Sequence, residues 1–131
     1  MPSLEPVIAI LDDDAQMRTA FRRLLTCRGF HVEEYESARE FLDALESHRP
    51  DCLLLDLHMP GLNGFDVLET LQSGERAIPV IVITAHDEPG TAERSFALGA
   101  ADYLRKPVQR AVLFAAIERV CQSFFSKHHP K

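Results

Sequence analysis

Five short hydrophobic segments recur along the chain, and a stretch with helical periodicity follows each of them. The most continuously apolar segments are residues 7–11, 52–55 and 80–84. Short apolar runs between turn signals are typical of strands that are buried on both faces. Residues 30–35 alternate apolar and polar side chains, as a half-buried edge strand does, and residues 101–104 are predicted to form a short fifth strand.

The stretches after the strands place apolar residues three and four positions apart, which is typical of amphipathic helices. Asp14 is predicted to cap the first helix, and Ser37 with Glu40 has the form of a capping box. Gly99 is predicted to end the fourth helix. We predict helices over residues 15–27, from 38 to about 45, from 63–64 to about 71, over about 91–98 and over about 109–125, with a frayed tail over 126–131.

This alternation of strand and helix predicts an α/β fold in three layers, with helices on both faces of a parallel sheet. Helices between successive strands act as right-handed crossover connections. The alternating segment suits an edge, and the apolar segments suit the centre. A doubly wound five-stranded (βα)5 sheet of order 2-1-3-4-5, a flavodoxin-like arrangement, accommodates both, and we expect this order. The strand order then reverses between the first and third strands, where such sheets bind ligands.

Composition narrows the functional classes. The 131 residues are expected to form a single domain, 1–131, with a core over about residues 7–125. A net charge of −6 without a basic run argues against direct binding of nucleic acid. No apolar run approaches the ~18 residues of a membrane span, and no signal peptide pattern opens the chain. Cys27, Cys52 and Cys121 are predicted to be buried free thiols in a reducing compartment, which favours a cytoplasmic protein.

Polar residues follow four of the predicted strands directly. Asp12, Asp13 and Asp14 come after the first strand, and Asp56 comes after the third. Thr84 ends the fourth strand, and Lys106 follows the fifth. Because the carboxyl ends of parallel strands meet at one edge of the sheet, we expect these side chains to converge there.

The convergence predicts a particular chemistry. Carboxylates that approach one another repel unless a cation lies between them, and Mg2+ bound by carboxylates, carbonyls and waters meets that need. Lys106 adds a positive charge on a flexible stem, and Thr84 adds a hydroxyl donor. A metal ion, an ammonium and a hydroxyl together suit a phosphoryl group in transfer. Asp56 can then act as the nucleophile and form an acyl phosphate.

At this point the chain resembles the receiver domains of two-component response regulators, over about residues 7–122. The resemblance is carried by Leu11-Asp12-Asp13-Asp14, Asp56-Leu57-His58-Met59-Pro60-Gly61, Ile83-Thr84-Ala85 and Tyr103-Leu104-Arg105-Lys106-Pro107. These four motifs occur in the family's order, each at the end of its predicted strand. Two of them look closest to receivers of LuxR/FixJ-type regulators.

The resemblance implies that Asp56 accepts a phosphoryl group from a phosphohistidine on a sensor histidine kinase or a histidine phosphotransfer protein. Asp13, the carboxylate of Asp56 and the backbone carbonyl of His58 would hold Mg2+, for which Mn2+ can substitute. Asp12 would contact the ion through water. The domain would thus be a phosphoacceptor switch with self-phosphorylation and autodephosphorylation chemistry, rather than an enzyme.

The resemblance also implies how the switch would work. Lys106 would pair with Asp56 at rest and with the phosphoryl group afterwards, and the Lys106–Pro107 bond would be a cis peptide. Thr84 would move toward the phosphoryl group, and Tyr103 would turn inward behind it. His58 and His86 each follow a site residue by two positions; either they are solvated loop residues, or they tune water access and the lifetime of the phosphoryl group.

The last helix indicates an output surface. Leu113, Ala116, Ile117, Val120 and Phe124 form its core stripe, and a second apolar stripe of Phe114, Cys121 and Phe125 is expected to stay exposed. Exposed apolar patches usually mark interfaces. We therefore expect the face made by helix 91–98, strand 101–104 and helix 109–125 to bind a partner or a second copy of the chain.

Two other interpretations remain open from the sequence. In a phosphatase of the haloacid dehalogenase type, Asp12 would be the nucleophile and Asp14 the acid/base, but Asp56 would have no role and no acidic residue follows Lys106 before Glu118. A receiver-like binding module without phosphorylation would not need the complete acidic, hydroxyl and lysine set. The chain is expected to be either a stand-alone receiver or a piece of a longer regulator.

Overall fold

The computed structural model describes residues 6–47, 49–59, 64–74 and 77–128, and of residues 122–128 it describes the backbone alone. Strands and helices alternate as the hydrophobic pattern predicts. The strands are β1 (Val7–Leu11), β2 (His31–Tyr35), β3 (Cys52–Leu55), β4 (Val80–Thr84) and β5 (Asp102–Arg105). The helices are α1 (Ala15–Cys27), α2 (Ala38–Ala44), α3 (Gly64–Ser73), α4 (Thr91–Ala97) and α5 (Arg110–His128).

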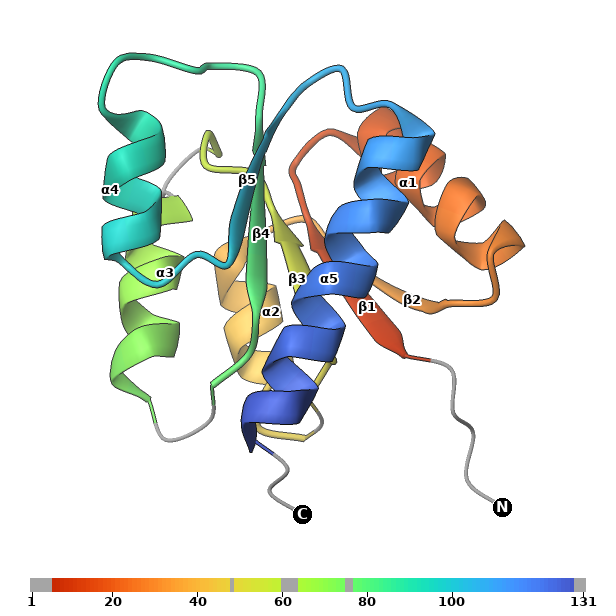
Figure 1. Cartoon of the computed structure of the whole chain (residues 1–131), viewed down its shortest axis with the longest axis horizontal. Helices are drawn as coiled ribbons and strands as arrows, with labels where there is room; N and C mark the ends of the chain where they lie inside the picture. Colours follow the sequence, from red (N-terminus) through yellow and green to blue (C-terminus); the bar gives the residue numbers. More distant parts are fainter. Residues whose placement is uncertain (1–5, 48, 60–63, 75–76, 129–131) are drawn as a thin grey trace.

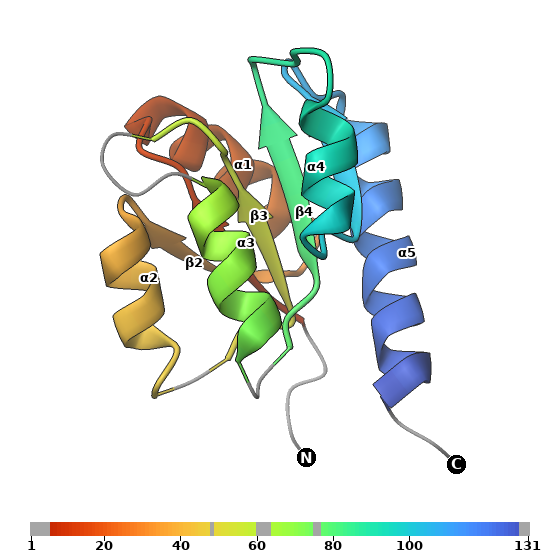
Figure 2. The same cartoon turned by 90° about the vertical axis from the view of Figure 1, so that its left-hand side faces the viewer.

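The five strands form one parallel sheet in the order β2-β1-β3-β4-β5, which confirms the predicted fold class. Figure 1 shows α1 and α5 on one face of the sheet, and Figure 2 shows α2, α3 and α4 on the other. Residues on alternate positions of the strands supply two separate cores, one beneath each helical layer. The central strands β3 and β4 are buried at every position, as their unbroken apolar sequences require.

The helix boundaries follow local capping chemistry. Asp14 caps α1 because its Oδ1 accepts the backbone N–H groups of Gln16 and Met17, as predicted. Ser37 caps α2 by accepting the N–H of Glu40. Gly99 follows α4 with φ +106°, a left-handed conformation that glycine adopts at low cost.

Several predicted boundaries differ from the structure. The fifth strand is shifted by one residue, and β2 begins at residue 31 rather than 30. Helix α5 continues to residue 128, so the frayed tail predicted from residue 126 is wrong for its first three residues. Hydrophobic periodicity marks which side of an element is buried, but the last turn of a helix depends on backbone hydrogen bonds that the pattern does not specify.

Two burial predictions are also wrong. Cys27 is exposed, because it ends α1 on the side away from the buried residues Phe21 and Leu25. Phe114 is buried, with 7% of its surface exposed, because it packs into the core beneath α1 and α5 and lies under the guanidinium of Arg28. Cys121 is half-buried, and the side chain of residue 125 lies outside the described residues.

Candidate functional site

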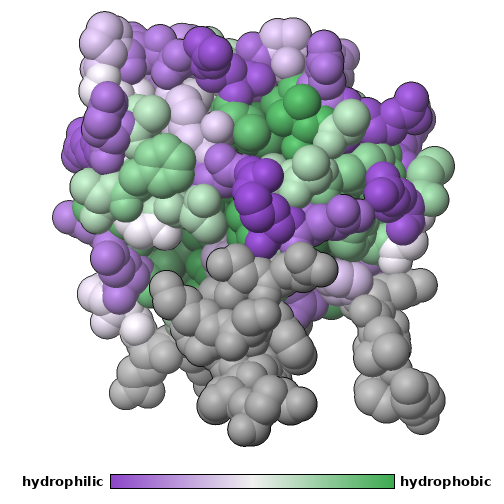
Figure 3. Space-filling view, in the orientation of Figure 1, coloured by the Kyte–Doolittle hydropathy of each residue, from purple (hydrophilic) through white to green (hydrophobic). Residues whose placement is uncertain are grey.

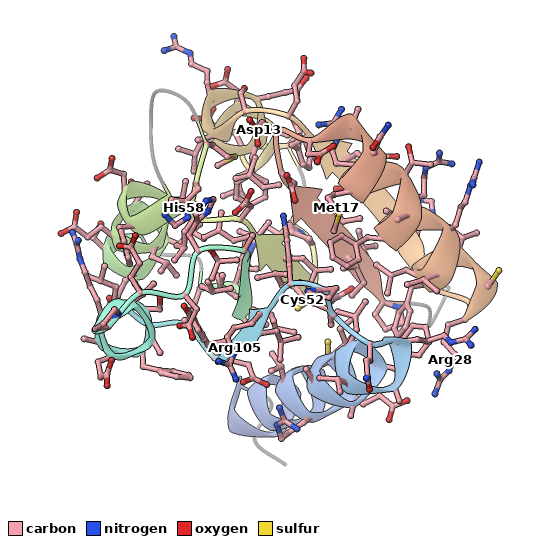
Figure 4. All side chains as sticks on the ribbon, turned by 90° about the horizontal axis from the view of Figure 1, so that it is seen from above. Asp13, Met17, Arg28, Cys52, His58 and Arg105 are labelled. Carbon is pink, nitrogen blue, oxygen red and sulfur yellow. The ribbon has the colours of Figure 1, made fainter. Side chains whose placement is uncertain are left out.

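The carboxyl ends of β1, β3, β4 and β5 bring the predicted site residues to one edge of the sheet. Leu11 pairs with Leu55, so Asp12 and Asp56 follow neighbouring strands at the same level. Thr84 pairs with Arg105, so Lys106 follows β5 just beyond the end of β4. Figure 4 looks onto this edge, with Asp13 and His58 in the loops that follow β1 and β3. The pairing of the strands therefore brings these residues to one place, whatever rotamers their side chains adopt.

A lysine shared by two carboxylates lies at the centre of the site. Lys106 Nζ lies 3.0 Å from Asp12 Oδ2 and 3.6 Å from Asp56 Oδ2. All three side chains are largely buried, with exposed fractions of 14%, 4% and 10%. The ammonium thus contacts Asp56 as expected, but lies closer to Asp12. The Lys106–Pro107 peptide bond is cis, as the resemblance implies.

The electrostatic balance at Asp56 is set by burial. Burial raises the pKa of the Asp56 carboxyl, while the backbone N–H of His58 and the ammonium of Lys106 lower it, and the carboxylate of Asp12 raises it. The hydrogen bond from His58 N to Asp56 Oδ1 is 3.2 Å long. The net direction is upward. One ammonium therefore does not fully compensate for removing these carboxylates from water.

The acidic side chains also have the composition of a site for a hard cation. Carboxylate oxygens of Asp12, Asp13 and Asp56 lie within 4.8 Å of one another. Asp13 is exposed, so the cluster opens to solvent on one side. Oxygen-only ligands with an open side suit Mg2+, which keeps several of its waters when it binds. The donor set and the unfavourable concentration of negative charge both fit such an ion.

Thr84 is fully buried at the end of β4, and its hydroxyl contacts two histidines. Thr84 Oγ1 accepts the backbone N–H of His86 at 3.0 Å and lies 3.2 Å from His58 Nδ1. The imidazole rings of His58 and His86 pack together, with centroids 4.3 Å apart and ring planes inclined by 49°. Both histidines are exposed, but their contacts place them beside Thr84 rather than free in solvent.

Tyr103 is half-buried on β5, and its hydroxyl donates to Asp87 Oδ1 at 2.8 Å. Arg105 lies 3.2 Å from the other oxygen of the same carboxylate. Burial raises the pKa of Tyr103 to about 12, with the Asp87 hydrogen bond adding to the effect. Asp87 therefore ties the loop after β4 to β5.

Two contributors to the site carry no signal in the sequence. Asp87 follows Thr84 by three residues, as many loop carboxylates do, and only the fold reveals its bonds to β5. Arg18 of α1 donates from Nη1 to the backbone carbonyl of Asp12 at 2.6 Å and thereby supports the acidic loop. Its spacing on α1 identifies it only as a polar helix residue.

The geometry disfavours the phosphatase interpretation. Asp14 would have to serve as the acid/base, yet its carboxylate accepts two backbone N–H groups as the cap of α1. Asp56, which would have no role, contacts the lysine.

Comparison with known sequences identifies the family of the chain. Residues 8–118 match the response regulator receiver domain. The DNA-binding transcriptional regulator NtrC of Klebsiella pneumoniae is 35% identical over 122 residues, which are 93% of this chain and 26% of that protein. The transcriptional regulatory protein FixJ of Bradyrhizobium diazoefficiens is 37% identical over 111 residues, which are 85% of this chain and 54% of that protein.

A solved structure agrees with these relatives. The crystal structure of a response regulator receiver protein from Burkholderia phymatum superposes with a TM-score of 0.81 at 44% identity, covering 90% of this chain and 96% of that one. The chain spans between a quarter and about half of the length of the two curated relatives. The match over most of the chain, the shared fold and the acidic pocket together lead to one assignment: the chain belongs to the response regulator receiver domain family of two-component signalling.

Proposed function

We propose that the chain is a phosphorelay switch in which Asp56 accepts a phosphoryl group from the phosphohistidine of a sensor histidine kinase or a histidine phosphotransfer protein. The observation that carries the proposal is the position of Asp56, whose carboxylate lies 3.6 Å from the ammonium of Lys106 and within 4.8 Å of carboxylate oxygens of Asp12 and Asp13. A carboxylate oxygen of Asp56 attacks phosphorus as the phosphorus–nitrogen bond of the donor breaks. The products are an aspartyl phosphate here and, with one proton taken from solvent by the leaving imidazole, a neutral histidine on the partner.

Asp13, Asp56 and the backbone carbonyl of His58 would hold Mg2+, with Asp12 in contact through water and Mn2+ as a substitute. When bound, the ion supplies positive charge that offsets the negative charge spread over the oxygens of the transferring group. The chain's own part is to position the nucleophile. The His58 N–H holds Asp56 Oδ1, and Lys106 lies within 3.6 Å of Oδ2 to contact the phosphoryl oxygens that arrive there.

The output of the switch would begin at Thr84 and Tyr103. Thr84 turns its hydroxyl toward the new phosphoryl group, and Tyr103 turns inward after leaving Asp87. The affected surface is the face of α4, β5 and α5, on which Phe96 and Val112 remain 48% and 45% exposed. Figure 3 looks onto this side, where hydrophobic surface lies between hydrophilic residues. We propose that this face forms a homodimer or binds a partner after phosphorylation.

The test is to incubate the chain with Mg2+ and a small phosphodonor, and to locate base-labile phosphate by mass spectrometry. We expect label on Asp56 and none in Asp56→Asn. Label on Asp12 would support the phosphatase instead. If a control receiver is labelled under the same conditions and this chain is not, the proposal is wrong. Chelation of the metal ion should abolish labelling, and sedimentation with and without phosphodonor measures dimer formation.

A further inference from the structure

The hydroxyl of Thr84 is already engaged in the structure. A hydroxyl has one hydrogen and two lone pairs. Thr84 Oγ1 uses one lone pair for the backbone N–H of His86 and shares a second contact, of 3.2 Å, with His58 Nδ1. Thr84 has no exposed surface, so its hydroxyl exchanges partners only within the protein. A hydroxyl that donates its hydrogen to Nδ1 can donate it to a phosphoryl group on Asp56 only after the contact with His58 breaks.

Two contacts hold His58 in place, one through its backbone and one through its ring. Its own backbone N–H is bound to Asp56 Oδ1 at 3.2 Å, which places the residue against the phosphoacceptor. Its ring packs on the ring of His86, with centroids 4.3 Å apart. His58 thus connects the acceptor carboxylate, through its backbone, with the switch hydroxyl, through its side chain.

We propose that His58 is a positioning residue whose imidazole holds the Thr84 hydroxyl in the resting arrangement, so that a phosphoryl group on Asp56 must compete with His58 for that hydroxyl. The proposal rests on the proposed function, because it needs Thr84 to turn toward the phosphoryl group. An interaction made in only one of two states shifts the equilibrium toward that state. His58 would therefore set how strongly phosphorylation must drive the switch, which is a different role from shielding the phosphoryl group against water.

The experiment measures the affinity of the full chain for beryllofluoride, a phosphoryl mimic, in the presence of Mg2+, by NMR of the Thr84 methyl group and the backbone amides. His58→Phe keeps a ring that can pack on His86 but has no ring nitrogen. A neutral hydrogen bond that exists only at rest opposes activation by about fivefold, so this variant should bind beryllofluoride about five times more tightly. His58→Asn keeps a hydrogen-bonding atom one bond from Cγ, as Nδ1 is, and should restore an affinity within about twofold of the wild type.

The same comparison in a Thr84→Ala background isolates the route of the effect. If His58 acts through the hydroxyl, His58→Phe should change nothing once the hydroxyl is gone. An unchanged affinity in His58→Phe, an equal gain in the Thr84→Ala background, or no rescue by asparagine would each overturn the proposal. His58→Ala replaces His58→Phe if urea unfolding shows that the latter is not folded.

The outcomes separate this proposal from the proposed function. If the wild type neither binds beryllofluoride nor is labelled on Asp56, the proposed function fails, and this proposal fails with it. If the wild type binds beryllofluoride and is labelled on Asp56, but His58→Phe and His58→Asn bind beryllofluoride with the same affinity as each other, only the role of His58 is refuted.

Discussion

Replacing Lys106 with methionine should show how much the buried acidic pocket lowers the free energy of unfolding when its ammonium is absent. Methionine keeps most of the length and apolar character of the lysine stem but removes the ammonium. That ammonium lies 3.0 Å from Asp12 Oδ2 and 3.6 Å from Asp56 Oδ2, with all three side chains at least 86% buried. Removing one partner of a buried ion pair leaves uncompensated charge and costs roughly 3 kcal/mol. With an m-value of roughly 2 kcal/mol/M, the midpoint of urea unfolding should fall by about 1.5 M.

The neighbouring residue provides a matched control. Arg105 pairs with Asp87 at 3.2 Å, but its side chain is 71% exposed, so Arg105→Met should cost less than about 1 kcal/mol. Both variants replace a cation by the same residue at adjacent positions. The difference between them therefore reports the burial of the acidic pocket rather than the loss of a charge.

The loss in Lys106→Met should also depend on pH, with a definite sign. The ammonium lowers the pKa of Asp56, so its removal raises further a pKa that burial has already raised. A carboxyl with a higher pKa in the folded state binds its proton more tightly when folded, so its penalty is full above that pKa and disappears as the pH falls through it. The gap to the wild type should narrow at mildly acidic pH. It should also narrow when Mg2+ is added at neutral pH, because the ion binds the folded pocket more tightly once no ammonium competes for the carboxylates. Equal losses in the two variants, or a gap that ignores both pH and Mg2+, would refute this account of the pocket.

Three further measurements test the surroundings of individual residues. In an alkaline titration followed by phenolate absorbance, Tyr35 and Tyr103 should both ionise near pH 12. The stability that their raised pKa values contribute should be present below about pH 10 and lost as the pH rises toward 12. Ionisation of either tyrosine near pH 10 would contradict the described burial. Iodoacetamide should alkylate Cys27 in the native chain and Cys52 only after unfolding, read by peptide mass. Gly64→Ala should lose about 1–3 kcal/mol in urea, because its Cβ would lie 2.6 Å from a backbone atom of the loop after β3; an unchanged midpoint would show that this loop can move away.

Much of the fold followed from the sequence because its signals are local and redundant. Unbroken apolar runs at residues 52–55 and 80–84 predict central strands, and the alternation at 30–35 predicts an edge; the observed sheet order accommodates all of them. The capping role of Asp14 followed for the same reason, since a cap needs only the adjacent turn of helix. The prediction for Phe114 was wrong because two helices cover it, and the periodicity of α5 alone cannot show where α1 lies.

The candidate site, too, could be predicted only in part. Which residues converge could be predicted, because strand ends meet wherever a parallel sheet forms. Which atoms pair could not be predicted, because that depends on the competition among groups within a few ångströms. Lys106 illustrates the difference: its proximity to Asp56 followed from the motif, whereas its shorter contact with Asp12 reflects two carboxylates sharing one ammonium.

That sharing also explains how so small a chemical change could switch the domain. One ammonium serves a cluster of three carboxylates, and the pKa of Asp56 is raised by burial first and by the carboxylate of Asp12 second, so the fold holds the pocket in an electrostatically unfavourable arrangement. Any event that alters the charge at Asp56 must redistribute Lys106 between its partners, because no other cation contacts either buried carboxylate among the described residues. Thr84 lies at the same edge with a hydroxyl bound to His58 through a solvent-exposed imidazole, a contact weak enough to be exchanged. A strained charge balance beside an easily exchanged hydrogen bond is the arrangement that a two-state switch needs, since the first supplies the drive and the second sets the threshold.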